Sequence, residues 1–114
     1  MDIEQLREYC LSKKEVTEGF PFGEDTLVFK VRGKIFLIAS LSRLQFNVKC
    51  DPEKAIELRE QYDAIQPGYH MNKKLWNTVI INAGVPAKLV MEMIDGSYFL
   101  IIKSLPKKEQ AGLI

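Results

Sequence analysis

The sequence has few residues of the kinds that bind transition metals: one histidine and two cysteines among 114 residues. A zinc site usually needs four clustered ligands, so this set predicts no zinc centre, and we expect no cofactor. Cys10 and Cys50 lack C-x-x-C spacing and occupy apolar positions of periodic segments. This placement predicts buried free thiols and no disulfide.

Motifs of the common enzyme classes are also lacking. The sequence contains no G-x-S-x-G, no P-loop and no G-x-G-x-x-G, and its single His has no evident triad. These absences predict a protein without catalytic activity.

Long apolar runs are lacking as well, since none approaches the roughly 20 residues that span a bilayer. The first residues, Met1–Gln5, carry early acids and no apolar segment, which predicts no signal peptide. We therefore expect a cytoplasmic protein with no membrane partner.

Charge is segregated along the chain, although the net charge is only +1. Residues 26–50 contain five basic residues and no acid, and residues 64–91 contain three basic residues and no acid. The 15 carboxylates lie elsewhere, seven in residues 1–25, five in 51–63 and three after 91. This distribution predicts a basic surface, whereas the modest total is not that of a typical nucleic-acid-binding domain.

Hydrophobic periodicity predicts a single domain over 1–114 with the order α-β-β-β-α-β-α-α. The predicted helices cover residues 2–12, 51–63, 86–95 and 97–105, and the predicted strands cover 26–32, 34–41, 44–50 and 74–81. Asp2 and Asp51 are expected N-caps, and Asp95-Gly96 is expected to end the third helix, with Ser97 capping its continuation. For residues 98–102 a strand is the alternative to a helix. The fold class is α+β, a two-layer sandwich with an antiparallel sheet of about four strands and helices on one face.

Two segments are predicted to lack regular structure. Lys13–Glu24 is expected to be a polar connector in which Phe20 and Phe22 cover the edge of the core. Pro106-Lys107-Lys108 is expected to end the last helix, and the final residues of the chain are expected to be frayed.

Alternation within the strands predicts one apolar face and one basic face. The inward positions are Leu27, Phe29 and Val31 in the first strand, Ile35, Leu37, Ala39 and Leu41 in the second, and Leu44, Phe46, Val48 and Cys50 in the third. Because neighbouring strands are antiparallel, we expect Lys30, Arg32, Lys34 and Lys49 to converge at one end of the uncovered face. Such cations suit phosphate oxygens, or alternatively they deter edge-to-edge strand pairing.

The segment 67–79 holds the only His and the only Trp and contains no carboxylate. Pro67-Gly68 is a turn signal, in which Gly accepts a positive φ. The candidate contact residues that follow are Tyr69, His70, Asn72, Lys73, Lys74 and Trp76. Aromatic residues beside lysines can stack on bases and bind the phosphate backbone. For Trp76 the usual burial of large aromatics favours a core position instead, and a lone His is more often structural.

The motif Pro67-Gly68-Tyr69-His70-Met71-Asn72-Lys73-Lys74 followed by Trp76-Asn77-Thr78-Val79 resembles that of the MmcQ/YjbR family. Further matching stretches are Pro21-Phe22-Gly23, Phe29-Lys30-Val31 with Gly33-Lys34, Lys49-Cys50-Asp51-Pro52, Ser97-Tyr98 and Leu105-Pro106-Lys107-Lys108. The resemblance implies a frataxin-like fold whose hairpin wings are proposed to contact DNA. It carries no catalytic residues, and Leu75 departs from a family pattern that often has a polar residue or His.

Three functions follow as hypotheses. The first is a non-catalytic, monomeric protein that binds nucleic acid, DNA in particular, by phosphate contacts. The second is a protein–protein interaction module that uses the same basic face, or the helical acids. The third is binding of a divalent metal by oxygen ligands on an acidic helix face formed by Asp2, Glu4, Glu8, Glu15 and Glu18.

Overall fold

The computed structural model describes residues 1–69 and 71–113, so the predicted contact residue His70 lies outside the described residues. The helices are α1 (Ile3–Leu11), α2 (Pro52–Gln61), α3 (Ala87–Lys103) and α4 (Lys107–Gln110). The strands are β1 (Val16–Gly19), β2 (Thr26–Val31), β3 (Lys34–Ser40), β4 (Gln45–Lys49), β5 (Ile65–Pro67) and β6 (Trp76–Ile80).

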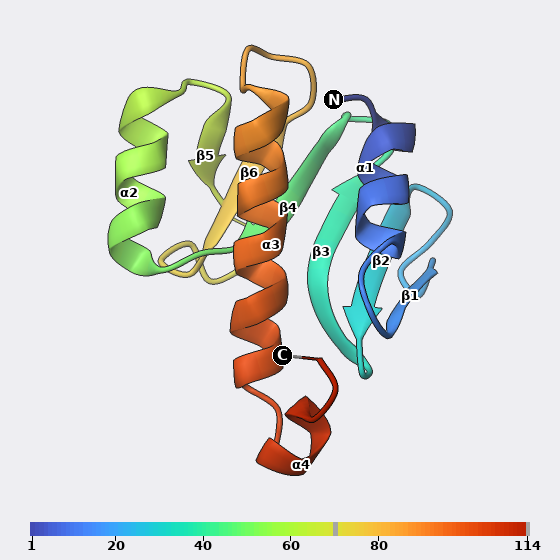
Figure 1. Ribbon diagram of the computed structural model, residues 1–114. Helices are drawn as coiled ribbons and strands as arrows, with labels where there is room; N and C mark the ends of the chain where they lie inside the picture. Colours follow the sequence, from blue (N-terminus) through green and yellow to red (C-terminus); the bar gives the residue numbers. More distant parts are fainter. Residues whose placement is uncertain (70, 114) are drawn as a thin grey trace.

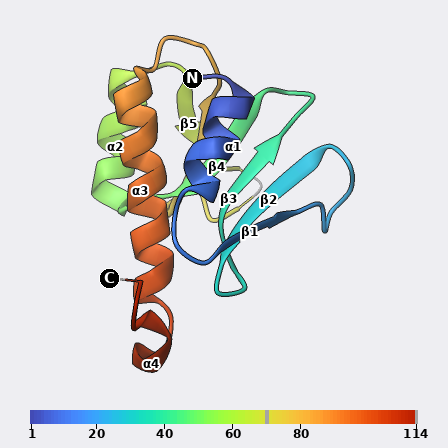
Figure 2. The ribbon, with the colours of Figure 1, turned by 45° about the vertical axis from the view of Figure 1, so that its right-hand side comes forward.

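The strands form one antiparallel sheet of six, in the order β1-β2-β3-β4-β6-β5. Helices α1, α2 and α3 cover one face of this sheet and leave the other face uncovered (Figures 1 and 2). The predicted α+β two-layer sandwich is therefore confirmed, with six strands in place of about four. The two unpredicted strands, β1 and β5, are short and lie at the two edges, where pairing with a single neighbour leaves little periodic signal.

Both predicted N-caps are confirmed. The Asp2 carboxylate accepts the Gln5 amide at 2.8 Å and the Gln5 side chain accepts the Asp2 amide at 2.9 Å, which forms a capping box. The Asp51 carboxylate accepts the Lys54 amide at 3.2 Å, and Pro52 occupies the first turn of α2. These local signals place the beginnings of α1 and α2 correctly.

The core lies between the sheet and the helices. Its buried cluster contains Leu6, Cys10, Leu27, Phe29, Val31, Phe36, Leu37, Ala39, Phe46, Val48, Leu58, Ile65, Val79, Val90, Met93, Ile94, Tyr98, Ile101, Ile102, Leu105 and Leu113. The predicted alternation in the second strand is wrong at Ile35 and Phe36. A bulge turns Phe36 inward against Phe29 and Tyr98, whereas Ile35 pairs with Lys30 and lies outside the buried cluster.

Three other apolar residues are more exposed than predicted. Leu44 is 48% exposed, because it precedes β4 in a turn with a φ of 50°. Phe20 and Phe22 are 51% and 65% exposed, so they do not cover the core. Both lie in the β1–β2 connection, and the connector predicted over Lys13–Glu24 also contains β1.

Helix α3 continues through Asp95-Gly96, where the sequence predicts a break. The Ser97 hydroxyl does not cap a new helix but donates to the Phe36 carbonyl at 2.5 Å and accepts the Lys49 amide at 2.9 Å. Phe36 lies at the bulge of β3, and Lys49 is the last residue of β4. Ser97 therefore joins β3 and β4 beyond their last pair, Leu37–Val48, and this tertiary role keeps the helix continuous.

Residues 107–113 are folded against the rest of the chain, contrary to the prediction of fraying. They contain α4, and Leu113 is buried at 8% exposure. The Gln110 side chain donates to the Leu105 carbonyl at 2.9 Å. Over the two described ranges, none of the helices has the length and apolarity needed to cross a bilayer.

Candidate nucleic-acid interface

Three chain connections meet at one end of the sheet. The β2–β3 hairpin turns through Arg32 and Gly33, whose φ values of 51° and 81° are typical of a two-residue hairpin. The end of β4 and the beginning of β6 lie at the same end, since Lys49 pairs with Trp76. The hairpin tip and the loop before β6 are therefore neighbours of the same sheet end, as the antiparallel order predicts.

The four cations of the hairpin and of β4 do not share one face, which corrects the prediction. Cross-strand partners point to the same side of a sheet, and Lys34 pairs with the core residue Val31. Lys34 therefore lies on the helix side, where its ammonium group is 3.4 Å from the Ser104 carbonyl. Lys30 and Lys49 alternate with core residues and lie on the uncovered side.

The predicted cations also differ in whether they form an ion pair with a carboxylate. The Arg32 guanidinium lies 3.3 Å from the Glu15 carboxylate, so its charge is partly compensated. Within residues 1–69 and 71–113, the other ion pairs are Arg7–Glu18 and Lys13–Asp95. Over the same residues, no carboxylate pairs with the remaining predicted cations, Lys30, Lys34, Lys49, Lys73 and Lys74.

The loop between β5 and β6 is held by its own backbone. Gly68 extends the β5–β6 ladder by donating its amide to the Trp76 carbonyl at 2.9 Å, and it has no positive φ, contrary to the turn prediction. The Asn72 side chain accepts the Lys74 amide at 3.0 Å, and the Asn72 carbonyl accepts the Trp76 amide at 2.9 Å. Asn72 thus shapes the loop, while Tyr69 is 71% exposed.

A second contact network, which the sequence analysis missed, ties this loop to α2. The Arg59 guanidinium donates to the Asn77 side chain at 2.7 Å and also to the Lys73 carbonyl. Asn77 is fully buried and donates in turn to the Ala55 carbonyl at 3.5 Å. The sequence contains a signal for this network. Alternation with Val79 places the polar Asn77 at a core position of the predicted strand, where its side chain needs a hydrogen-bond partner.

Tyr69, Lys73 and Lys74 come together over a shallow hollow beside α2. The hollow is about 430 Å³ and is lined by Pro52, Ile56, Arg59, Pro67, Tyr69, Lys73 and Lys74. Trp76 lies outside it, half-buried on the uncovered side of β6 as the partner of Lys49, so the preference for a core position is wrong. A phenol, an indole and several ammonium groups are thus presented near one sheet end.

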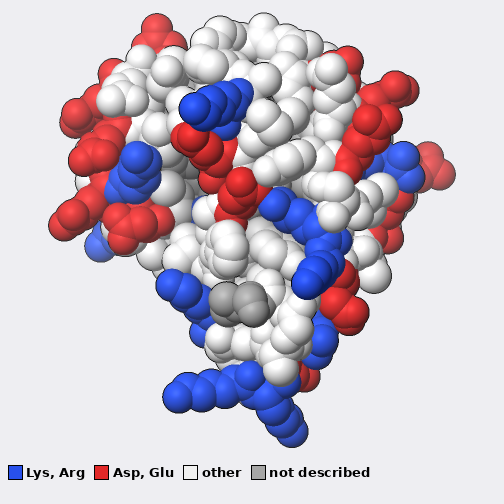
Figure 3. Space-filling view, viewed as in Figure 1, with Lys and Arg blue, Asp and Glu red and all other residues white. Residues whose placement is uncertain are grey.

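The segregation of charge follows the two ends of the molecule as well as the two faces. Figure 3 shows Lys and Arg protruding at the lower end, where α4 and the β2–β3 hairpin lie, while most Asp and Glu lie over the upper and lateral parts, where some Lys and Arg are interspersed. The basic end contains Lys107 and Lys108 of α4, which the sequence analysis did not single out as contact residues.

Three of the five acids of the proposed metal-binding helix face, Asp2, Glu15 and Glu18, have other partners. Asp2 caps α1, Glu18 accepts two hydrogen bonds from Arg7 at 2.6 and 2.7 Å, and Glu15 pairs with Arg32. The hydrogen bond from Arg7 lowers the pKa of Glu18 below its ordinary value. In the part of the chain that the structure describes, no three His, Cys, Asp or Glu side chains are grouped as metal ligands would be.

Both cysteines are free thiols, as predicted, but only one of them is fully buried. Cys10 lies in the core, where desolvation raises its pKa to about 12. Cys50 is half-buried at the beginning of the β4–α2 connection, and desolvation raises its pKa as well.

The comparisons with known proteins agree with the fold and the resemblance. The uncharacterized protein YbdF of Escherichia coli O157:H7 is 40% identical over 93 residues, which cover 80% of this chain and 76% of YbdF. A crystal structure of a Deinococcus radiodurans protein with a DUF419 domain matches with a TM-score of 0.91 and 38% identity, covering 98% of this chain and 87% of that one. A Pseudomonas syringae protein matches with a TM-score of 0.76 and 26% identity, covering 88% of this chain and 98% of that one.

Family membership follows from the length of the match. The YjbR family profile covers residues 11–100, and the uncharacterized protein YjbR of Escherichia coli K12 is 27% identical over 100% of this chain and 98% of its own length. The chain therefore belongs to the YjbR family.

Proposed function

We propose that this protein binds DNA through phosphate contacts made at the sheet end where the β2–β3 hairpin, the end of β4 and the β5–β6 loop meet. One observation carries the proposal: Lys49, Lys73 and Lys74 lie at one sheet end, and none pairs with an acid in the described ranges. Unpaired ammonium groups gathered at one site repel each other, and a polyanion relieves that repulsion. Catalysis has no part in the proposal.

The loop supplies the second element of the proposed interface. Arg59 donates to the Lys73 carbonyl and the Asn72 side chain accepts the Lys74 amide, so Lys73 and Lys74 extend from a hydrogen-bonded backbone and lose less freedom on binding. Exposed Tyr69 offers a ring face to a base or sugar. Lys30 and the hairpin tip extend the proposed contact surface across the sheet.

Salt dependence tests the proposal quantitatively. Four or five phosphate contacts predict that log K falls with log salt with a slope of about −4. Binding of a labelled duplex, measured by fluorescence anisotropy at several salt concentrations, gives this slope. The double variant Lys73→Glu/Lys74→Glu should weaken binding and reduce the slope by about 2.

The matched control is Lys88→Glu, which changes the same kind of charge near the beginning of α3, at the end of the molecule opposite α4 (Figure 1). It should leave the slope nearly unchanged. A slope near zero, or equal losses for the loop and control variants, would reject the proposal. Capture of a partner that survives nuclease treatment would instead favour the alternative, an interaction module for an acidic protein.

A further inference from the structure

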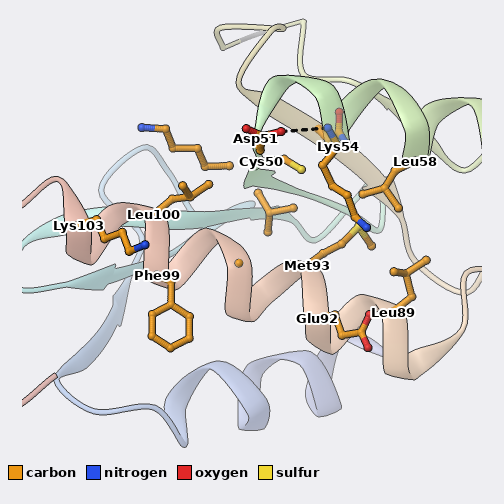
Figure 4. A pocket seen from close by; sticks show the side chains of 14 residues that line it. Cys50, Asp51, Lys54, Leu58, Leu89, Glu92, Met93, Phe99, Leu100 and Lys103 are labelled. Carbon is orange, nitrogen blue, oxygen red and sulfur yellow. Dashed lines mark hydrogen bonds between the residues drawn. The ribbon is translucent and has the colours of Figure 1, made fainter. Parts of the chain in front are cut away.

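A groove on the helix side separates α2 from α3, and of the cations proposed to bind DNA through unpaired ammonium groups it shares Lys49 but not Lys73 or Lys74. Helix α3 packs on β2, β3 and β4, whereas α2 packs on β5, and the groove runs between them over the end of β4 (Figure 4). It has a volume of about 330 Å³, at the lower end of the range of small-molecule sites. Its lining residues include Val48, Cys50, Leu58, Leu89, Met93 and Leu100.

Three cations, Lys49, Lys54 and Lys103, and two acids, Asp51 and Glu92, line the groove. Lys54 extends from α2 toward Met93, and the ammonium group of Lys103 is directed along the groove from α3 (Figure 4). Neither forms an ion pair with a carboxylate of residues 1–69 or 71–113. Of the two lining acids, Asp51 is engaged as the cap of α2, and Glu92 is turned away from α2.

The glycine at position 96 also indicates that the groove holds a ligand. It lines the groove within a 17-residue helix, where Gly is less favourable than Ala by about 1 kcal/mol. A Cβ added there would meet no atom within 4 Å, so close packing within this chain does not require glycine. What the missing side chain provides is room in the groove.

We propose that this groove binds a small amphipathic carboxylate, such as a medium-chain fatty acid. The carboxylate would lie against the ammonium group of Lys54, and the alkyl chain would lie along Met93 and past Gly96 toward Leu100 and Lys103. The apolar walls supply the driving force for binding, and the cations of the groove select the negative head group.

Cys50 provides a direct readout, because its half-buried thiol lines the groove. Decanoate at submicellar concentration should slow alkylation of Cys50 by iodoacetamide at least about fivefold, measured by peptide mass spectrometry at constant pH. Cys10 has 0% exposure and should remain unlabelled, which shows that decanoate has not unfolded the protein. Decanol and decyltrimethylammonium, which have the same chain length without a negative charge, should protect Cys50 much less.

Two variants separate the ligand site from general effects on the fold. Gly96→Leu should keep or raise the midpoint of chemical denaturation, because it removes a helical glycine into open space, yet reduce decanoate affinity more than tenfold. Lys54→Met/Lys103→Met should lower the affinity for decanoate to that for decanol. Absence of Cys50 protection, equal protection by the cationic amphiphile, or unchanged affinity in Gly96→Leu would each overturn the proposal. DNA binding is tested separately by Lys73→Glu/Lys74→Glu, because neither of these residues lines the groove.

Discussion

Gly68 lies so close to Trp76 that a side chain there has no space. A Cβ at Gly68 would be 3.0 Å from both the Cβ and the carbonyl oxygen of Trp76. The contact also positions the point where the loop that carries Lys73 and Lys74 joins β6, since the Gly68 amide donates to the same Trp76 carbonyl. The glycine is needed for close approach and not for a left-handed backbone.

Gly68→Ala should therefore lower the free energy of unfolding by about 1–3 kcal/mol, because the backbone of β6 must shift. Gly19→Ala is the matched control, since a Cβ at Gly19 meets nothing within 4 Å and its change should stay within about 0.5 kcal/mol. Urea denaturation of both variants measures the difference. Equal stabilities would contradict the close approach.

Asp25 is the residue for which a pH dependence can be predicted. Its carboxylate accepts the Ser42 amide at 2.7 Å and the hydroxyls of Ser42 and Ser40 at 2.8 and 3.1 Å. The hydrogen bond from the Ser42 side chain is the main cause that lowers the pKa of Asp25 below its ordinary value of 3.8. A carboxylate whose pKa is lower in the folded state than in the unfolded state stabilises the protein at pH values above the unfolded-state pKa. This contribution is lost as the pH falls through the folded-state pKa.

The native protein should therefore lose more stability than Asp25→Asn between about pH 5 and pH 2. Denaturation midpoints measured at several pH values across this range test the difference. The exposed neighbour Glu24 is the control position, because its side chain makes no hydrogen bond with the described residues. Parallel pH profiles for the native protein and Asp25→Asn would remove Asp25 as a source of acid sensitivity.

At the scale of elements, α3 is held to the sheet by a hydroxyl in its middle. Ser97 is fully buried and satisfies two backbone groups that the bulge and the end of the β3–β4 pairing leave unpaired. Asp95, two residues earlier, accepts the Tyr9 hydroxyl at 2.6 Å and so ties α3 to α1. These contacts explain why a segment with the composition of a turn remains helical.

Ser97→Ala should lower the free energy of unfolding by about 2 kcal/mol or more, since a buried carbonyl and a buried amide lose their partner. Ser12→Ala, at the exposed end of α1, should cost less than about 1 kcal/mol. Thermal and urea denaturation give both values. A similar small loss at the two positions would mean that water replaces the Ser97 hydroxyl.

At the scale of the whole molecule, both sheet edges are short strands. β1 has four residues and β5 has three, and β5 ends at Pro67. The amide of Gly68 points inward to β6, so by alternation the nitrogen of Pro67 faces away from the sheet, where proline offers no donor. Such an edge disfavours pairing with a second copy.

Pro67→Val should consequently increase self-association without unfolding the protein. Sedimentation velocity at increasing concentration should show a monomer for the native chain and added larger species for the variant. Gln66→Val is the control, because it adds the same β-branched side chain to an exposed residue of β5 but leaves the proline in place. Identical sedimentation of the native chain and Pro67→Val would contradict a protective role for the proline.

The sequence by itself determined the beginnings of α1 and α2, the β2–β3 hairpin and the two-layer α+β class. Each depends on signals within a few residues: the Asp2 and Asp51 caps, the Arg32-Gly33 turn and strand alternation. It also determined that the carboxylates avoid residues 26–50 and 64–91.

Only the tertiary structure decided the edge strands, the continuity of α3, the face on which Lys34 lies and the partnership of Arg59 with Asn77. These features depend on residues far apart in the chain, such as Ser97 with Phe36 and Glu15 with Arg32. The physical reason is that a bulge or a buried hydrogen bond changes which way a side chain points, and its partner cannot be identified until the elements pack together.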